Sequence, residues 1–116
     1  ENFLNVVEFR HASWWNSRVY SVLGKEKIIF CGTSHPDLSD EIVKNNSTIY
    51  YRFHGLKKLY FSQYAKKDID AFANTLAQES SVSTAFIYFN NTATLAAVRN
   101  AMQLEKGLLK NKLMRT

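Results

Sequence analysis

The stretch TIYYRFHG, from Thr48 to Gly55, decides the fold class of this chain. Its β-branched and aromatic residues, followed by a glycine, are typical of a β-strand. Arg52 and His54 stand two positions apart near its end, so they lie on one face of the strand. The same pattern, a hydrophobic strand that finishes in polar side chains, recurs in NVVEFRHASWW (residues 5–15) and in AFIYFNNT (residues 85–92).

Stretches with the two-residue period of strands alternate along the chain with stretches that have the helical period. We expect strands at residues 4–11, 27–34, 47–55 and 83–91, and helices at about 14–23, around 69–76 and from Thr92 onward. Four strands separated mostly by helices predict a (βα)4 unit with a parallel sheet, which is an α/β fold. The length of 116 residues suits one domain, residues 1–116.

Each predicted helix has an apolar stripe that we expect to face the sheet. Ser13 is the expected N-cap of the first helix and Gly24 its end. The expected buried stripes are Trp15, Val19, Val22 and Leu23; then Ile69, Phe72, Ala73 and Leu76; then Leu95, Val98, Met102, Leu109 and Leu113.

Composition limits the compartment and the partners. The single cysteine, Cys31, excludes an internal disulfide, and no apolar run approaches the roughly 20 residues that cross a bilayer, so we expect a cytoplasmic protein. The net charge is +5, and Lys106, Lys110 and Lys112 contribute to it near the end of the last helix. Such lysines complement the helix dipole, and aromatic residues do not interleave with them, so we expect neither nucleic acid nor a membrane as a partner.

The polar strand ends have one explanation if the strands are parallel. Ligand sites in such folds form beyond the carboxyl ends of the strands. Alternation pairs Glu8 with Arg10 on one strand and Arg52 with His54 on another, while Asn90 ends the last strand on the matching face. We therefore expect these side chains to lie together in one polar site at the carboxyl ends of the strands, which we call the mouth. Plainer interpretations remain open: a buried ion pair of Glu8 with either arginine, a turn histidine at position 54, and helix-capping roles for Asn90 and its neighbour Asn91.

Known cofactor and metal patterns are missing from the sequence. A G-x-G-x-x-G motif follows none of the predicted strands, and there is no Walker sequence, so a nucleotide-binding Rossmann unit is disfavoured. Glu8, His11, His35 and His54 could ligate a metal, but they lack a diagnostic spacing. We assign no metal and no cofactor.

Three blocks together resemble one known family. They are VVEFRHASWW, IYYRFHG and FIYFNNTATLAAVRNAMQL, which span Val6 to about Leu104. In this order they resemble the DUF72 family, the YecE-like proteins. The resemblance implies a TIM-barrel-like fold of about twice this length, of which this chain would be the C-terminal half. The residues that match the family pattern are Glu8, Arg10, Arg52, His54, Asn90, Asn91 and Asn100, with Trp15 and Tyr60 as weaker candidates.

One departure from the family concerns the second strand. The resemblance implies an aspartate at the end of that strand, where this sequence has CGTSHP, so Thr33, Ser34 or His35 occupies the place. Any catalytic role on that strand therefore does not carry over.

Two functions from different classes fit the mouth. In the first, Arg10 and Arg52 bind the phosphate or carboxylate of a small phosphate- or sugar-containing substrate. His54 is then the acid or base, Glu8 its partner or a second base, and Asn90 and Asn91 orient hydroxyl groups. In the second, the same residues form a binding module without chemistry, for a phosphorylated metabolite or nucleic acid. Whether the protein is an enzyme stays open at this point.

The outer strands predict a partner for the domain itself. A barrel closes with eight strands, and the first and last predicted strands here lack the lysines and prolines that normally protect sheet edges. Val6, Tyr50, Phe86 and Tyr88 would also lose the opposite wall. We expect the chain to be a fragment that pairs with the missing N-terminal half of the barrel or with a second copy of itself, and to bind a small anionic ligand.

Overall fold

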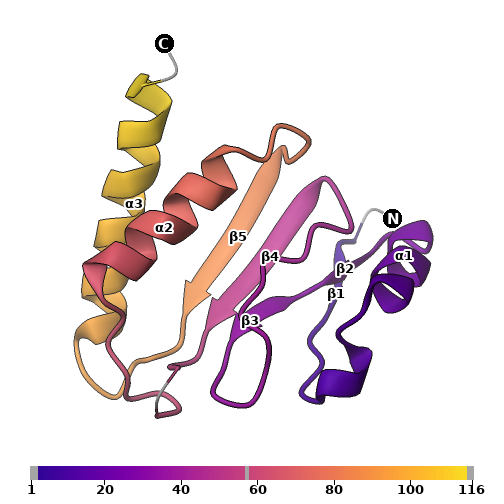
Figure 1. The fold of residues 1–116 in the computed structure, drawn as a ribbon, viewed down its shortest axis with the longest axis horizontal. Helices are drawn as coiled ribbons and strands as arrows, with labels where there is room; N and C mark the ends of the chain where they lie inside the picture. Colours follow the sequence, from indigo (N-terminus) through magenta and orange to yellow (C-terminus); the bar gives the residue numbers. More distant parts are fainter. Residues whose placement is uncertain (1–2, 57, 115–116) are drawn as a thin grey trace.

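Strands and helices alternate in the computed structural model, which describes residues 3–56 and 58–114, with side chains as far as residue 112. The elements, in chain order, are β1 (Asn5–Val7), a 3₁₀ turn (Ala12–Trp14), α1 (Ser17–Lys25), β2 (Ile28–Phe30), β3 (Gly32–Ser34), β4 (Thr48–Phe53), α2 (Lys66–Ala77), β5 (Thr84–Phe89) and α3 (Ala96–Met114). Figure 1 shows that β4 and β5 run side by side while α2 and α3 return in the opposite direction. The α/β class is confirmed.

All described strand pairs are parallel, as predicted. β1 pairs with β2, and β3, β4 and β5 form a second sheet in that order. The predicted strand at 27–34 is divided: its first part pairs with β1 and its second part with β4. The division lies at Cys31, whose backbone N–H donates to Val7 O at 2.9 Å. A stagger of this kind is what a sheet shows when it curves toward a barrel.

The side chain of Asn45 explains why β2 does not pair with β4. Its Oδ1 accepts a hydrogen bond from Phe30 N–H at 3.1 Å, and its Nδ2 donates to Ile28 O at 3.0 Å and to Tyr20 O at 3.2 Å. The amide therefore takes the place that a neighbouring strand would occupy along β2. The hydrophobic periodicity of the sequence does not predict these hydrogen bonds of Asn45.

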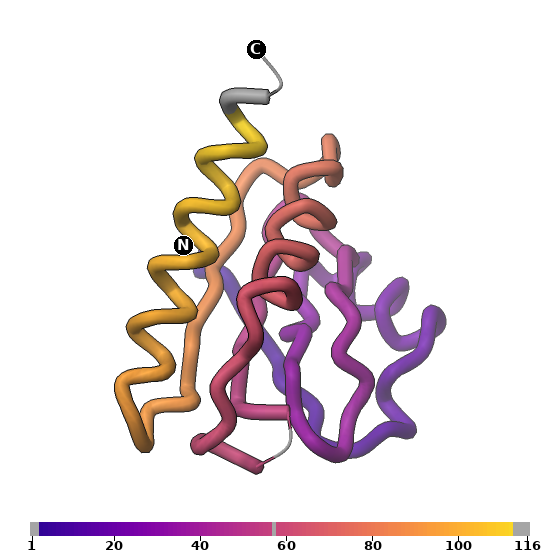
Figure 2. The backbone as a smooth tube through the Cα atoms, turned by 60° about the vertical axis from the view of Figure 1, so that its left-hand side comes forward, coloured from indigo at the N-terminus to yellow at the C-terminus, as the bar shows by residue number. Residues whose placement is uncertain are grey.

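The core lies between the β3–β4–β5 sheet and two helices. Its buried residues are Ile49, Tyr51, Phe53, Tyr64, Ile69, Ala73, Leu76 and Leu104. Phe53 is central, with ring centroids 4.5 Å from Phe89 and 4.9 Å from Phe72. The predicted stripe of the middle helix is thus confirmed. Figure 2 shows α2 and α3 lying next to each other along one side of the sheet.

The first helix begins later than predicted. Asn16 is its N-cap, accepting a hydrogen bond from Val19 N–H at 3.0 Å, whereas Ser13 lies in the preceding 3₁₀ turn. Asparagine is as good a cap as serine, and the intervening turn lets Trp15 pack edge-on against Phe30, with ring centroids 4.9 Å apart.

Two further predictions about that helix were wrong. It continues through Gly24 to Lys25. Val22 is exposed, and Tyr20 instead contacts Phe30, with ring centroids 4.7 Å apart. The aromatic ring reaches the strand from a position that the apolar pattern did not include.

The buried face of α3 differs from the prediction. The predicted stripe at Leu95, Val98, Met102 and Leu109 is exposed, and the side chain of Leu113 lies outside the described residues. The helix begins at Ala96, and it buries Ala96, Ala97, Asn100 and Leu104. Small side chains let the helix approach the sheet closely, so its most apolar face points away. In the part of the chain that the structure describes, no helix is long and apolar enough to span a membrane.

Candidate functional site

Glu8 is the centre of a polar cluster at the ends of the strands. Its Oε2 accepts a hydrogen bond from Arg52 Nη1 at 2.7 Å, and its Oε1 lies 3.0 Å from Arg10 Nε and 2.7 Å from His54 Nε2. Arg52 Nε also donates to Asn90 Oδ1 at 3.0 Å. The structure therefore brings together five of the six predicted site residues, and Glu8 pairs with both arginines. We call these five residues the Glu8 cluster.

The parallel register puts these side chains at one level. Thr33, Arg52 and Tyr88 are register partners across β3, β4 and β5. Beyond the strands, His54 N–H donates to Ser34 O at 2.9 Å and Asn90 N–H donates to Phe53 O at 2.7 Å, so the ladders continue into the site. Neighbouring residues in register share a face of the sheet, which is why sequence alternation located the cluster.

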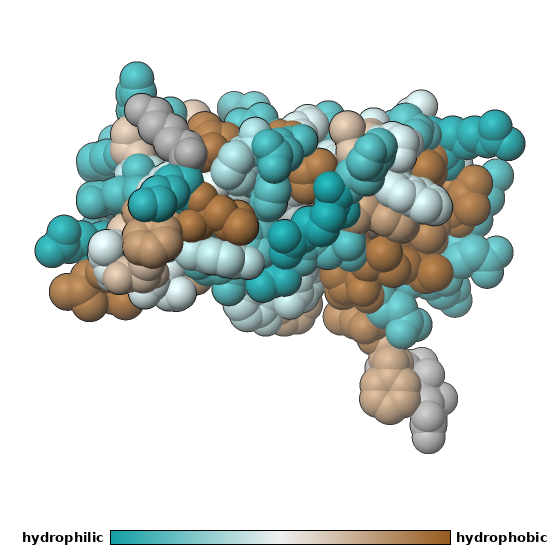
Figure 3. All heavy atoms as spheres, turned by 90° about the horizontal axis from the view of Figure 1, so that it is seen from below, coloured by the Kyte–Doolittle hydropathy of each residue, from teal (hydrophilic) through white to brown (hydrophobic). Residues whose placement is uncertain are grey.

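Figure 3 views the molecule from the end at which the strand arrows of Figure 1 finish. Strongly hydrophilic side chains lie across the middle of this face, between hydrophobic areas on either side. A polar centre with apolar surroundings is the usual make-up of a ligand site.

Glu8 is held in its ionised form. Its side chain is only 15% exposed. Burial acts to raise the pKa of Glu8, but the hydrogen bond from His54 and the charges of Arg10 and Arg52 outweigh it and lower this pKa to about 2. A carboxylate with such a low pKa is a poor proton donor or acceptor near neutral pH. Its position suits an electrostatic anchor that orients His54.

His54 is fully buried, with 0% of its side chain exposed. Because Glu8 is ionised, Nε2 carries the proton that lies between them. Nδ1 has no hydrogen-bond partner among the described residues. This buried ring nitrogen is an atom of the cluster without a partner, which makes it a candidate for proton transfer.

Aromatic rings and a tight turn surround His54. The rings of His35 and Tyr60 lie edge-on to it, each with its centroid at 6.1 Å. The chain turns at Gly55, where φ is +104° and an added Cβ would lie 2.5 Å from Lys58 O. Only glycine fits there without strain. Through this turn, Tyr60 N–H donates a hydrogen bond to His54 O at 2.6 Å, which fixes both residues.

Asn91 does not join the cluster. It is fully buried on the opposite face from Asn90, and its Nδ2 donates to Ser62 O at 2.9 Å and to Asn100 Oδ1 at 3.1 Å. The alternation that turns Asn90 inward turns its neighbour outward, under α3. This position does not suit the predicted contact with substrate; Asn91 supports the loops instead.

Asn100 is the centre of that supporting network. Its Oδ1 accepts from Tyr64 N–H at 3.2 Å, and its Nδ2 donates to Tyr64 O at 3.0 Å and to Gln103 Oε1 at 3.0 Å. Tyr64 OH in turn donates to Ser34 Oγ at 2.7 Å and accepts from Gly55 N–H at 2.8 Å. Sequence reasoning singled out Asn100 through the family pattern but missed Tyr64, which lies in an irregular segment before α2, and gave no structural role to Ser34.

We expect Asn100→Leu to lower the free energy of unfolding by about 2 kcal/mol, because buried backbone and amide groups lose their partners while the volume is kept. Urea denaturation followed by tryptophan fluorescence measures this. Gln78→Leu is the control, since Gln78 is exposed at the end of α2 and its side chain makes no hydrogen bond to a described residue. Equal stability of both variants would contradict the structural role of the network.

The structure shows where the three residues at the end of the second predicted strand lie. Thr33 faces inward beside Arg52 and is fully buried, with no partner for Oγ1 among the described residues. Ser34 points the other way, to Tyr64. Burial and the charge of Arg10 lower the pKa of His35, which lies near the cluster. A hydroxyl and an imidazole therefore occupy the place where the resemblance implied a carboxylate.

The residues considered as metal ligands do not converge. His11 is exposed and its Nδ1 contacts Ser13 Oγ at 2.7 Å, within the 3₁₀ turn. Across residues 3–56 and 58–114, no three His, Cys, Asp or Glu side chains gather closely enough to hold a metal ion.

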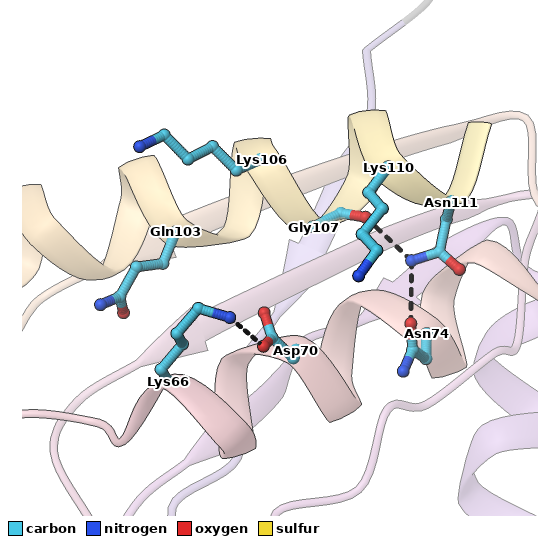
Figure 4. A pocket seen from close by; sticks show the side chains of 8 residues that line it. All are labelled: Lys66, Asp70, Asn74, Gln103, Lys106, Gly107, Lys110 and Asn111. Carbon is cyan, nitrogen blue, oxygen red and sulfur yellow. Dashed lines mark hydrogen bonds and ion pairs between the residues drawn. The ribbon is translucent and has the colours of Figure 1, made fainter. Parts of the chain in front are cut away.

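A groove of about 750 Å³ lies between α2 and α3, and it contains no member of the Glu8 cluster. Figure 4 shows that its side chains mostly bond to one another. Lys66 Nζ donates to Asp70 Oδ2 at 2.6 Å, and Asn111 Nδ2 donates to Asn74 Oδ1 at 2.8 Å. The first pair lies within α2 and the second joins α2 to α3, so both contribute to the helical layer and neither supplies a group for chemistry.

Comparisons with known proteins agree with this geometry. A family model described as "Protein of unknown function DUF72" matches residues 1–115. The structure is similar to that of a DUF72 family protein from Enterococcus faecalis, with a TM-score of 0.84 and 17% identity over 93% of this chain and 48% of the other. It is also similar to a DUF72 family protein from Thermotoga maritima, with a TM-score of 0.83 and 25% identity over 91% and 46% of the two chains.

The search of curated proteins found no match. The chain spans about half the length of the solved structures that it resembles. With the family model matching nearly every residue, and with parallel strands that superpose on two solved members, the chain belongs to the DUF72 family.

Proposed function

We propose that the Glu8 cluster binds the anionic group of a small phosphate- or sugar-containing substrate, at the mouth of an enzyme-like TIM barrel. The observation that carries this is the charge balance: two guanidinium groups share the one carboxylate of Glu8. The cluster therefore keeps at least one surplus positive charge. A partly buried positive charge favours an anion strongly, because the local dielectric constant is lower than that of water.

The arginines also have donors to spare. Arg10 uses Nε for Glu8, and Arg52 uses Nε and Nη1 for Asn90 and Glu8. Both terminal nitrogens of Arg10, and Nη2 of Arg52, make no hydrogen bond to another described residue. Their side chains are 46% and 32% exposed, so solvent and ligands reach them. Guanidinium groups with free N–H donors suit the paired oxygens of phosphate and carboxylate.

In this proposal His54 is the acid or base, and Glu8 orients it. The Glu8–His54 contact of 2.7 Å fixes the proton on Nε2 and leaves Nδ1 without a partner, as a carboxylate does in other carboxylate–histidine pairs. Because Nδ1 is buried in this conformation, the side chains around it must move before a substrate meets it. Asn90, held by Arg52, has its amide N–H₂ to offer to a hydroxyl group or to developing negative charge. Hydrolysis and isomerisation are the reactions that we would test first.

Replacing Arg10 tests the anion site. We expect Arg10→Gln to weaken the binding of inorganic phosphate and of a sugar phosphate about tenfold, because charge-assisted hydrogen bonds are lost. Titration calorimetry on the purified protein measures both affinities. Arg18→Gln, on the exposed surface of α1, is the control for the loss of one positive charge. Equal affinities of the two variants would argue against an anion site at the cluster.

A second candidate function is a binding module for a phosphorylated metabolite, without chemistry. It is favoured by the complete burial of His54 and the low pKa of Glu8, since neither group exchanges protons readily with bulk solvent in this conformation. The same arginines would then hold the ligand. Substitution of His54 separates the two functions, because only the enzyme needs its free nitrogen.

We infer a cytoplasmic location from the thiol of Cys31. This free cysteine is buried, and its burial, with the charge of Glu8, raises its pKa to about 12. It is therefore a packing residue under the cluster. A chain with one inert thiol fits a reducing compartment.

A further inference from the structure

His35 directly follows β3 and lies beside the Glu8 cluster without belonging to it. Ser34 and Phe53 are the last register partners of β3 and β4, so His35 continues this register opposite His54. The hydrogen bond from His54 N–H to Ser34 O, at 2.9 Å, holds the two strand ends together at this point. The rings of His35 and His54 meet edge-on, with centroids 6.1 Å apart. His35 therefore lies at the same mouth as the cluster.

A hydrogen bond within its own loop fixes the imidazole of His35. Its Nδ1 accepts from Asp37 N–H at 3.1 Å, two positions further along the chain. The neutral ring therefore carries its proton on Nε2, because a nitrogen that accepts a hydrogen bond holds no proton. Nε2 makes no hydrogen bond to another described residue. In contrast to His54 Nδ1 it is not one of the buried unpaired atoms, so solvent reaches it.

The surroundings of His35 keep its ring neutral. Burial and the charge of Arg10 lower its pKa, with a smaller contribution from His54, and together they outweigh Asp37 and Glu8, which act to raise it. The imidazole is therefore a neutral hydrogen-bond donor at neutral pH. Such a donor can stabilise negative charge on a ligand without adding a second charge that must lose its water.

We propose that His35 is a further substrate-binding residue, whose Nε2–H donates a hydrogen bond to the anionic group that Arg10 and Arg52 hold. This role rests on the proposed function, because it needs an anion at the cluster. Both oxygens of Glu8 are already occupied, so the free groups at the mouth are donors. They come from the ends of three strands: Arg10 after β1, His35 after β3 and Arg52 on β4. Donors on three sides suit a tetrahedral oxyanion, such as a phosphate ester, better than a planar carboxylate.

The loop bond of His35 allows its two ring nitrogens to be tested separately. An asparagine side chain can accept a hydrogen bond from the backbone N–H two positions on, as Nδ1 does from Asp37. It is too short to reach the place of Nε2. His35→Asn therefore keeps the turn and removes the donor. The longer His35→Gln variant brings an amide N–H₂ to about the place of Nε2.

Binding of sulfate tests the donor. Sulfate is a tetrahedral oxyanion whose charge stays constant over the range in which histidine titrates. We expect His35→Asn to weaken its binding about tenfold at neutral pH, and His35→Gln to stay within about threefold of the wild type. Titration calorimetry measures these affinities, with acetate as a planar comparison that His35→Asn should affect less. His11→Asn is the matched control, because His11 Nδ1 accepts from Ser13 N–H at 3.2 Å in the same two-residue pattern on an exposed turn.

NMR of the histidine ring nitrogens provides a readout that a purely structural role would not change. We expect His35 of the wild type to be protonated on Nε2 at neutral pH. Added sulfate should shift the Nε2 signal of His35 and leave that of His11 in place. If His35→Asn does not fold, this shift in the wild type decides the question.

Three results would overturn the role of His35. A wild type that binds neither sulfate nor phosphate would reject the anion site of the proposed function, and this role with it. Sulfate binding that His35→Asn leaves unchanged would reject the role of His35 alone. Equal weakening by His35→Asn and His35→Gln, with an Nε2 signal that sulfate does not shift, would show that His35 only shapes its loop.

Discussion

His54→Gln should lower the turnover of a phosphate- or sugar-containing substrate by about 10²–10⁴, the usual contribution of a general acid or base. Glutamine keeps a hydrogen-bond donor for Glu8, so the pairing seen at 2.7 Å can be retained. What it removes is Nδ1, the ring nitrogen without a partner among the described residues. Binding should change little, because the arginines that hold the anion keep their contacts with Glu8.

The measurement is a steady-state assay of the wild type and the variant against a panel of sugar phosphates and a chromogenic phosphate ester. Calorimetric affinities are determined alongside. His11→Gln is the control, because His11 is exposed and bonds only within its own turn. Unchanged turnover in the His54 variant would reject the catalytic role. A wild type that binds these ligands but converts none would support the binding module.

Glu8→Gln should reduce the free energy of unfolding at neutral pH by up to about 3 kcal/mol, the equivalent of lowering a pKa from 4.5 to about 2. An amide cannot compensate Arg10 and Arg52, and His54 loses its anionic partner. Removing one member of a partly buried charge cluster leaves the others unpaired, which is the costly case. The thermal midpoint should fall by several degrees.

The pH dependence of the wild type has a defined sign. The pKa of Glu8 is lower in the folded state than in the unfolded chain, so the unfolded state binds its proton first as the pH falls. The stabilisation is complete above about pH 4.5 and is lost progressively between about pH 4.5 and pH 2. The Glu8→Gln variant should lack this part of the acid destabilisation.

Thermal denaturation followed by circular dichroism, from neutral to acidic pH, tests both statements. Glu26→Gln is the matched control, since Glu26 is exposed at the end of α1. An unchanged midpoint for Glu8→Gln would mean that its carboxylate is solvated and that the cluster is loose.

The arrangement of the cluster could be predicted because it depends on two simple regularities. Alternation puts Arg52 and His54 on one face, and parallel strands end at one edge of the sheet. Neither regularity depends on side-chain detail, so Glu8 and Asn90, which directly follow β1 and β5, were placed with them.

Packing that depends on shape rather than polarity could not be predicted. The stripe at Leu95, Val98 and Met102 is the most apolar face of α3, yet alanines and Asn100 face the sheet. Hydrophobic periodicity identifies a face that avoids water in the complete domain, and it does not say which neighbour covers that face. The start of α1 was predicted wrongly for a similar reason. Asn16 and Ser13 are both good caps, and only the packing of Trp15 distinguishes them.

The supporting network escaped prediction because its contacts are irregular. Tyr64 and Ser34 lie 30 positions apart in the chain and meet through a single hydroxyl pair. Buried polar groups require partners, but the requirement does not identify them. Asn91 was predicted as a binding residue from its residue type. It directly follows Asn90 in the chain, so its side chain lies on the other face.

The division of the second strand at Cys31 gives the molecule two mechanical parts. β1 and β2 form one small sheet, against which α1 packs, while the main core cluster consists of residues from β4, α2, α3 and the segment before α2. Glu8 belongs to the first part, and Arg52, His54 and Asn90 belong to the second. A local opening of the first part would therefore separate Glu8 from Arg52 and His54 while the main core stays folded, so the cluster persists only as long as the first part stays closed.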